Sequence, residues 1–494
     1  MGTGNKKIKI ELTDTMENVT SNAGILAIAE FFEKSGLNKA IDEHIGARKG
    51  RGASDSEHIL TMVVSQICGN STVEQQKHLP GKVGALGLAI PSVTAARRYM
   101  ECFVNNESEL RRHKGACYVP EQNEHLAGFE KIHAHLFKVA HRLSPQETLT
   151  LDQDATYIES GKGGSFYNYG GLRGYGALNT YCVEHDLMVA TQYRDANVNP
   201  GYNQLEELKR VLALVPDGVK KICLRSDSAG YQTDILRFCA EGKVERFGVI
   251  DFAISCPVKP EFRVAVMRVQ ENEWRPLRDE TGTIRQEWAE VAYAPESLST
   301  SKKPHEYRFF VTRERMIVKR SSETNENTQR ALFPELEITY LEEQNPNMKK
   351  LHLTALSGRI YKIFGVVSNI SDKSGAEIIR WHRGRCGKSE EAHDILKSDL
   401  GGGHVPSSQF GANAFWWNVS VLSMSVNNLL KRFLLPHGFA TCRLKTLRTL
   451  FYTVVGKIVH HARQTVLKLS SRDIGATLLL YAQKKMERLV ACRT

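Results

Sequence analysis

Hydrophobic positions in the first 145 residues recur at helical spacing. Residues 23–36 (AGILAIAEFFEKSG) and 56–68 (SEHILTMVVSQIC) carry apolar side chains three and four positions apart, and the first run stops at a glycine. Ser92 is a suitable N-cap for a third helix over AARRYMECF, and a fourth helix is expected at about 122–142. The chain is therefore predicted to be helical as far as Ser144 and Pro145.

The third predicted helix resembles the second helix of a helix-turn-helix motif. Ser92, Thr94, Arg97 and Arg98 would then face DNA. A capped surface helix that happens to carry two arginines explains the same pattern equally well. Arg97 and Arg98 are accordingly candidate DNA-binding residues.

After Pro145 the pattern changes to short β-rich runs separated by glycine and asparagine. Strands are expected at 148–154, 177–184 and 187–193, then a helix at 203–214, a strand at 220–227, a helix at about 230–241 and a strand at 246–251. Three strands that can form a meander, followed by strands alternating with helices, fit a mixed five-stranded sheet flanked by helices. This is the order of an RNase H-like core.

Residues 256–370 contain the strand-like runs RVAVMRVQ, EYRFFVTRE and IYKIFGVVSN, and helix returns at about 375–400. The predicted fold is a multidomain α/β protein whose RNase H-like core is interrupted by a β-rich insertion, with helical domains at both ends. The expected division is a helical DNA-binding domain at 1–145, the core at 146–255 and 371–404, the insertion at 256–370, and a basic helical C-terminal domain at 405–494.

The composition is that of a soluble globular protein large enough for several cores, with 494 residues of which 41% are hydrophobic and 24% charged. No apolar run approaches ~18 residues, and the polar N-terminus lacks a signal-peptide block, so a cytoplasmic, nucleoid-associated protein is expected. The ten cysteines are scattered without a CxxC pair and are predicted to be reduced core thiols. A zinc site built from His382, Cys386 and His393 is a weaker alternative.

The net charge of +11 is concentrated at one end of the chain. Residues 401–494 hold thirteen Lys and Arg against two acids, Asp473 and Glu487, so the preceding 400 residues sum to zero. A concentrated basic surface favours a polyanion such as DNA, because each neutralised phosphate releases counterions. A basic face that is merely solvated is the alternative.

Two predicted strands carry carboxylates at positions where ligands bind. In LTLDQDAT, strand alternation places Asp152 and Asp154 on one face. The strand KICLRSD ends at Asp227, at the edge of the sheet where α/β proteins place ligands. An edge strand whose acids face solvent, and a helix cap at Asp227, are the respective alternatives.

A third candidate lies in the predicted helix GKSEEAHDILKSDL, where Glu390, His393, Asp394 and Lys397 share one face. Two aspartates from the sheet and one helical glutamate supply hard oxygen ligands for two Mg²⁺ or Mn²⁺ ions. Such a metal pair catalyses in-line phosphoryl displacement. No Walker A, GxGxxG, HExxH or GxSxG motif offers a competing chemistry.

Three blocks, DQDAT, LRSDSAGY and RCGKSEEAHDILKSDL, resemble the signatures of bacterial DDE transposases, specifically the insertion-sequence 1380 family. The resemblance extends to ELTD near the start, to YNYGGLRGY and to LKTLRTLFYTVVGKIVHHAR, and so covers most of the chain. It implies that the first acid precedes a small residue and Thr, which selects Asp154 as the metal ligand and keeps Asp152 in reserve. Asp227 matches the second acid.

The third block of the resemblance is a pattern of Tyr, two residues, Arg, three residues, Glu, six residues and Lys. Glu390 and Lys397 fit its second half, but Arg385 lies five positions before Glu390 instead of four, and Trp381 or His382 stands near the expected Tyr. The resemblance implies that Arg385 and Lys397 bind phosphates of the DNA ends. Lys388 on the same helix is a further candidate DNA-binding residue.

The expected function is DNA transposition. The protein would bind the terminal inverted repeats of an insertion sequence, hydrolyse the transferred strand with two metal ions, and join its 3′-hydroxyl to target double-stranded DNA. Pairing two ends requires at least a homodimer. The alternatives are a metal-dependent nuclease or resolvase that cleaves without joining, and a catalytically silent DNA-binding protein derived from a transposase.

Overall fold

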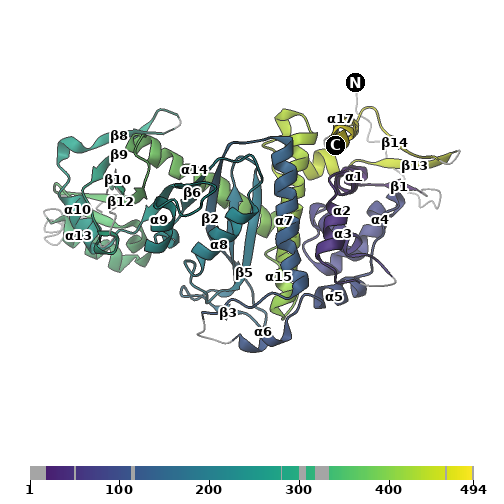
Figure 1. Cartoon of the computed structure of the whole chain (residues 1–494), viewed down its shortest axis with the longest axis horizontal. Coiled ribbons are helices and arrows are strands. Elements are labelled where there is room, and N and C mark those ends of the chain that lie inside the picture. The colour runs from purple at the N-terminus through teal and green to yellow at the C-terminus, as the bar shows by residue number, and fades with distance from the viewer. Residues whose placement is uncertain are drawn as a thin grey trace, which may run out of the picture.

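The computed structural model describes residues 18–48, 52–112, 117–279, 281–299, 307–317, 333–461 and 464–491. The ELTD block at 11–14 lies outside these residues. Along the long axis of the molecule, a helical region at one end is followed by a central sheet flanked by long helices and by a second β-rich region at the other end (Figure 1). No helix in the described part of the chain is both long and apolar enough to cross a membrane.

The N-terminal region is helical, as predicted. Ser54 starts one helix with a capping box to Glu57, and the hydroxyl of Ser92 accepts a hydrogen bond from Ala95 N at 3.2 Å, which confirms Ser92 as an N-cap. The helices are α1 (Leu26–Lys34), α2 (Leu37–His44), α3 (Asp55–Ile67), α4 (Leu79–Val83), α5 (Val93–Glu101), α6 (Asn106–Arg111) and α7 (Glu124–Leu143).

The central sheet has the strand order β5-β4-β2-β6-β7. Strands β2, β4 and β5 form an antiparallel meander, and β6 and β7 continue parallel to β2, as the predicted order requires. The elements are β2 (Thr148–Glu159), β4 (Arg173–Cys182), β5 (Leu187–Asp195), α8 (Gln204–Leu214), β6 (Lys221–Ser226), α9 (Thr233–Ala240) and β7 (Asp251–Cys256). The first four strands were predicted within a few residues of their observed bounds.

The fifth strand was placed wrongly at 246–251. Val244 and Gly248 form a bridge across a tight turn, and the strand starts only at Asp251. The reason is burial, because Phe252, Ala253 and Ile254 are fully enclosed between the layers. The apolar residues that precede Asp251 belong to this turn and its exit rather than to a strand.

The sheet does not end at β7. Strand β12 (Arg359–Ser368) pairs antiparallel with β7 and leads to β10 (Arg308–Arg315), β9 (Ile284–Val291) and β8 (Arg275–Arg278). With β3 (Phe166–Tyr167) and β11 (Leu353–Leu356), the result is one mixed sheet of 11 strands. The predicted strands at EYRFFVTRE and IYKIFGVVSN are confirmed.

The third run of that region, RVAVMRVQ, was predicted as a strand and is a helix. Helix α10 (Pro260–Met267) has proline in its first turn, and its buried residues Phe262, Ala265 and Val266 follow helical spacing. Two further helices, α11 (Glu296–Ser299) and α13 (Pro334–Gln344), also belong to residues 256–370. That stretch is therefore mixed rather than purely β.

Helix α14 (Gly375–Asp394) returns to the central sheet and continues into a π-helical turn at Ile395–Asp399. Helix α15 (Phe410–Leu429) is buried on all sides, and it packs against α3, α5, α7 and β5. A helix that is buried all round connects the core of the N-terminal helices with that of the sheet.

The C-terminal region is not wholly helical. Besides α16 (Leu444–Leu447) and α17 (Ile474–Ala491), it contains a hairpin of β13 (Gly456–His461) and β14 (Gln464–Leu469). Strand β13 pairs with β1 (Val19–Thr20), and α17 packs against α1, so the two ends of the chain meet in one structural unit (Figure 1).

Candidate active site

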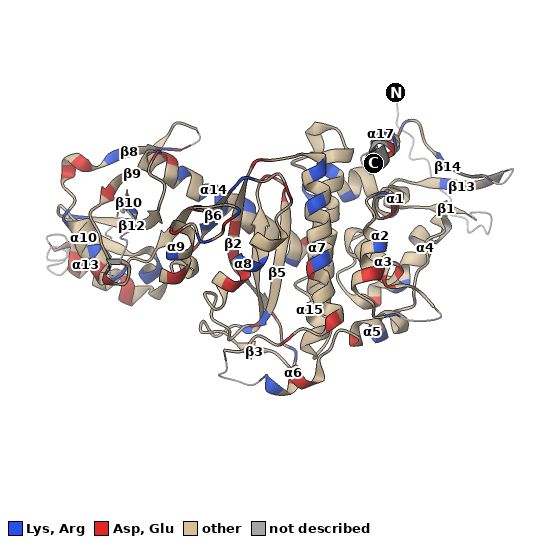
Figure 2. Cartoon of the chain, viewed as in Figure 1, with Lys and Arg blue, Asp and Glu red and all other residues tan. Residues whose placement is uncertain are grey.

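Helix α14 lies across the face of the sheet that carries Asp152 and Asp154. Gln153, which points the other way, donates through Nε2 to Gln204 O of α8 at 3.1 Å. Acidic residues of β2 therefore lie against basic residues of β6 and α14, where red and blue ribbons meet in Figure 2.

The carboxylate of Asp152 is held completely by Arg225 of the adjacent parallel strand. Arg225 donates through Nε to Oδ1 at 2.6 Å and through Nη2 to Oδ2 at 2.7 Å. Its third nitrogen, Nη1, donates to Trp381 O at 2.6 Å. The exposed fractions of the two side chains are 0% for Asp152 and 5% for Arg225. Both oxygens of Asp152 are thus occupied by a buried ion pair.

The carboxylate of Asp154 is less fully engaged. Its Oδ2 accepts from Arg385 Nη1 at 3.0 Å and from Ser389 Oγ at 3.2 Å. Burial raises the pKa of Asp154, although the guanidinium of Arg385 opposes that shift. Its side chain remains 15% exposed, so solvent or a ligand can reach it.

Asp227 follows β6 and meets Asp154 at the carboxyl end of the sheet. Its Oδ1 accepts from Ala229 N at 3.0 Å, so the side chain also caps the short turn that follows, as the alternative interpretation expected. Burial raises the pKa of Asp227, and the charge of Asp154 raises it further. The two carboxylates therefore lie close enough to repel one another.

Glu390 does not join them. Its side chain is exposed, and the residue of α14 that reaches Asp154 is the preceding one, Ser389. Within the described ranges, no three His, Cys, Asp or Glu side chains form a cluster that could hold a metal ion.

The predicted charged stripe of Glu390, His393, Asp394 and Lys397 is not a single face. His393 is buried with its Nε2 3.0 Å from Asn179 Nδ2, and burial lowers its pKa to about 4, whereas Asp394 is exposed and pairs with Arg443. The π-helical turn at Ile395–Asp399 adds a residue per turn, so the i, i+7 relation to Lys397 expected for a regular α-helix does not apply.

The donor chemistry of Asp154 and Asp227 fits a divalent ion such as Mg²⁺ or Mn²⁺. Two partly buried carboxylates, of which Asp154 raises the pKa of Asp227, would be stabilised by a cation between them, and oxygen is the ligand that these ions prefer. The proposed zinc ligands do not come together: Cys386 is exposed, while His382 Nε2 lies 3.1 Å from Ser226 O and 3.2 Å from Ser255 Oγ. Burial lowers the pKa of His382 to about 3 and keeps it neutral.

The candidate DNA-binding residues are spread over several surfaces. Lys397 lines a cavity of ≈ 400 Å³ beside Ala155, while Lys388 lines a smaller one with Asp186 and Lys431. On α5, Arg98 is exposed and Arg97 pairs with Glu74 on the surface. Lys397 shares its cavity with residues 155–159 of strand β2.

Two functional neighbours escaped the sequence analysis. Ser389 stands among charged residues in the sequence, and no role was predicted for it. Arg225 was considered only as a member of the block LRSDSAGY. Side-chain alternation along the strand KICLRSD would place Arg225 beside Asp152, but only once this strand and LTLDQDAT are known to be parallel neighbours.

A sequence model of the family described as transposase DDE domain group 1 matches residues 3–491. The chain belongs to this family. DDE transposases generally use divalent metal ions, which agrees with the donor chemistry of Asp154 and Asp227.

None of the curated proteins compared with this DDE transposase chain matches it. Among solved structures, it is similar to a piggyBac transposase in a cryo-EM synaptic complex with hairpin DNA, at 9% identity and a TM-score of 0.42, over 95% of this chain and 82% of that one. At this identity and TM-score the similarity decides nothing about function.

Proposed function

We propose that this protein is the DNA transposase of a bacterial insertion sequence of the 1380 family. It binds the terminal inverted repeats, cleaves the transferred strand and joins its 3′-hydroxyl to target DNA. The observation that carries the proposal is the convergence of Asp154 and Asp227, two partly buried carboxylates directly after the paired residues Gln153 and Ser226 of β2 and β6, in a chain that belongs to a DDE family. The strand order β5-β4-β2-β6-β7 supports an RNase H-like core for these two residues.

Asp154 and Asp227 would hold divalent metal, Mg²⁺ or Mn²⁺, and Glu390, the third ligand that the resemblance selects, would turn from its exposed position toward them. When two such ions are bound, they activate the attacking oxygen and stabilise the leaving one. Ser389 and Arg385 both donate hydrogen bonds to one oxygen of Asp154, Oδ2, which a metal ion would compete for. Asp152 is a positioning residue, because Arg225 occupies both of its oxygens.

The DNA partner is double-stranded, and the protein works as a homodimer in the complex that pairs two ends, in the bacterial cytoplasm. Arg385, Lys388 and Lys397 contact the phosphates of the ends, and Arg97 and Arg98 of α5 contact the repeats. The excess of thirteen basic over two acidic residues in 401–494 supports a polyanionic partner.

The experiment compares Asp154→Asn, Asp227→Asn and Glu390→Gln in a cleavage assay with labelled element ends and Mg²⁺. Glu391→Gln is the matched control, since Glu391 is an exposed neighbour of Glu390 on α14. Each of the three variants should lose strand cleavage and keep end binding, while the control retains both. Full cleavage by any one of them removes that residue from the site.

A strand-transfer assay with pre-cleaved ends tests the second half of the reaction. Joined products with the unmodified protein support a transposase. Cleavage without joining under the same conditions identifies a nuclease or resolvase instead, and binding without metal-dependent cleavage identifies a silent DNA-binding protein.

A further inference from the structure

The connection between β2 and β4, residues 160–172, presents two aromatic side chains to solvent. We call this segment the tyrosine loop. The exposed fractions are 57% for Tyr167, 90% for Tyr169 and 52% for Leu172. Exposed aromatic residues gathered on one short loop indicate a surface that meets a partner.

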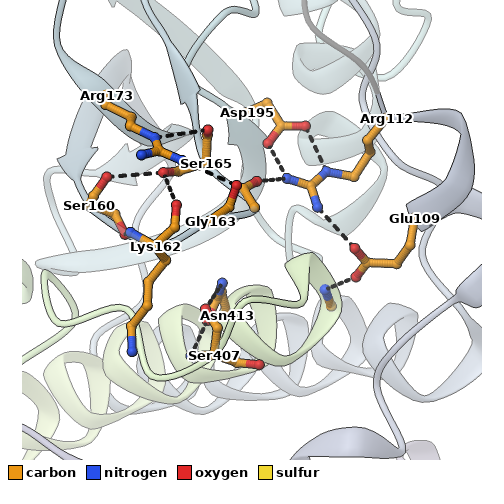
Figure 3. Close-up of polar contacts among 12 residues, drawn as sticks. Glu109, Arg112, Ser160, Lys162, Gly163, Ser165, Arg173, Asp195, Ser407 and Asn413 are labelled. Atoms are coloured by element: carbon orange, nitrogen blue, oxygen red, sulfur yellow. Dashed lines mark hydrogen bonds and ion pairs between the residues drawn. The ribbon is translucent and has the colours of Figure 1, made fainter.

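Two arginines hold the base of the tyrosine loop to the body of the protein (Figure 3). Arg173 donates to Ser165 O at 3.2 Å and to Gly163 O at 3.1 Å. Arg112 donates to Gly164 O at 2.6 Å, while Asp195 binds the same guanidinium at 2.7 and 2.9 Å. The backbone of the loop is therefore fixed before any partner arrives.

The tip of the loop is closed by its own polar group. Asn168 Oδ1 accepts from Gly170 N and Leu172 N, each at 2.9 Å, and Gly171 adopts a φ of +79° that only glycine takes without strain. Tyr167 directly precedes this closed turn, and Tyr169 lies within it. Because the turn is already ordered, little conformational entropy is lost when a ligand stacks on the two rings.

A cavity of ≈ 400 Å³ lies between the tyrosine loop and strand β2, which is within the volume of small-molecule sites. Its lining includes Asn168, Leu172, Arg173 and Lys397, together with Ala155, the residue after Asp154. The cavity therefore opens next to the candidate catalytic carboxylate.

Two cationic side chains that line the cavity, Arg173 and Lys397, have no carboxylate partner in the described ranges. Arg173 donates to backbone carbonyls and Lys397 forms no ion pair with any side chain in the described ranges, so neither cation is neutralised by a carboxylate partner. The only acid in the lining is Glu159, which is exposed. The lining includes two aromatic residues, Tyr157 and Tyr175, and the guanidinium of Arg173 lies 5.9 Å from the ring centre of Tyr167 in the adjoining loop. Cations beside aromatic rings match the phosphate and the base of a nucleotide.

We propose that the tyrosine loop and this cavity bind unpaired DNA, with a base stacked on Tyr167 or Tyr169 and its phosphate on Arg173 and Lys397. Single-stranded rather than duplex DNA fits, because paired bases already stack on each other and offer no free face to a tyrosine. The inference rests on the proposed function in one respect, the source of the unpaired DNA, which would be a frayed end of the element beside Asp154.

The experiment measures the affinity of the full chain for a fluorescein-labelled oligothymidylate by anisotropy, with EDTA and without cleavage. Truncating a stacking aromatic residue costs about 5- to 150-fold in affinity per base. We expect Tyr169→Ala to fall in this range, the double variant Tyr167→Ala/Tyr169→Ala to bind more weakly still, and Tyr169→Phe to bind as the unmodified protein does. Tyr340→Ala, on α13 away from the loop, is the control and should be unchanged.

Duplex DNA without unpaired ends provides the second measurement, and its affinity should be the same for all variants. Unchanged oligothymidylate binding by the double variant overturns the proposal, as does an equal loss for single-stranded and duplex DNA. Dissociation of a homodimer by the double variant in sedimentation would instead assign the loop to a contact between copies. Because these measurements need no metal, they stand or fall separately from cleavage by Asp154 and Asp227.

Discussion

Asp152 and Asp154 lie two positions apart on one face of β2, yet their substitution should lower stability to different extents. Asp152→Asn leaves the charge of Arg225 buried, at 5% exposure, without its bidentate partner. Burial raises the pKa of Asp152 against the influence of Arg225, so the intact ion pair itself adds little. Because the guanidinium of Arg225 would stay buried without its carboxylate, the substitution should lower the free energy of unfolding by about 3–5 kcal/mol.

Asp154→Asn removes a different balance of forces. It weakens the charged hydrogen bonds from Arg385 and Ser389, each worth about 1.5–3 kcal/mol, and leaves Arg385 without its carboxylate, but it relieves both the burial of a carboxylate and its repulsion of Asp227. These contributions partly offset one another, and both side chains are more exposed than the pair of Arg225 and Asp152, so we expect a smaller loss in the free energy of unfolding than for Asp152→Asn. A metal ligand of this kind matters less for folding than for catalysis.

The assay is urea denaturation in EDTA at neutral pH, followed by end cleavage in Mg²⁺ at a temperature where each variant is folded. Asp251→Asn is the control, because this strand aspartate pairs with a half-exposed Lys221, and such pairs contribute less than about 1 kcal/mol. The reasoning is refuted if Asp152→Asn is as stable as the control, or if Asp154→Asn loses as much stability as Asp152→Asn should.

Three further outcomes are expected. The pKa values of Asp154 and Asp227 are raised in the folded state, so the metal-free protein should lose stability as the pH rises above about 4 and passes through these raised pKa values. Added Mg²⁺ should restore the lost stability. A melting temperature that depends neither on pH nor on Mg²⁺ in this range would contradict the site. Arg385→Ala frees the Asp154 carboxylate and should tighten Mn²⁺ binding about tenfold by calorimetry, whereas weaker binding would show that Arg385 organises the ligands. Gly128→Ala should destabilise the protein by about 1–3 kcal/mol in urea, because its Cβ would lie 2.2 Å from His44 O, while Gly438→Ala, with open space around it, should be neutral; equal effects would exclude the observed contact of α2 with α7.

Long periodic segments could be predicted from the sequence because their pattern is a local property. Helices α1, α3, α5 and α7 follow from apolar spacing, and α5 also from the cap at Ser92. Short apolar runs could not be assigned in the same way. The run at 263–270 was read as a strand and is α10, since a few apolar residues fit either element until their neighbours are known.

Pairing between distant segments was also beyond the sequence. The hairpin of β13 and β14 is stabilised by β1, more than 400 residues earlier in the chain, and no local pattern announces such a partner. The same holds for β12, which extends the central sheet by pairing with β7.

The sequence by itself determined the order of the strands and the carboxylates they carry. Side-chain alternation and strand ends are local patterns, and both can be recognised in LTLDQDAT and KICLRSD. Only the tertiary structure decided how those carboxylates are used. The parallel register of β2 and β6 places Arg225 on Asp152 and leaves Asp154 beside Asp227. The packing of α14 turns Ser389 toward Asp154 and Glu390 toward solvent, since the rotation of a helix is fixed by what it packs against.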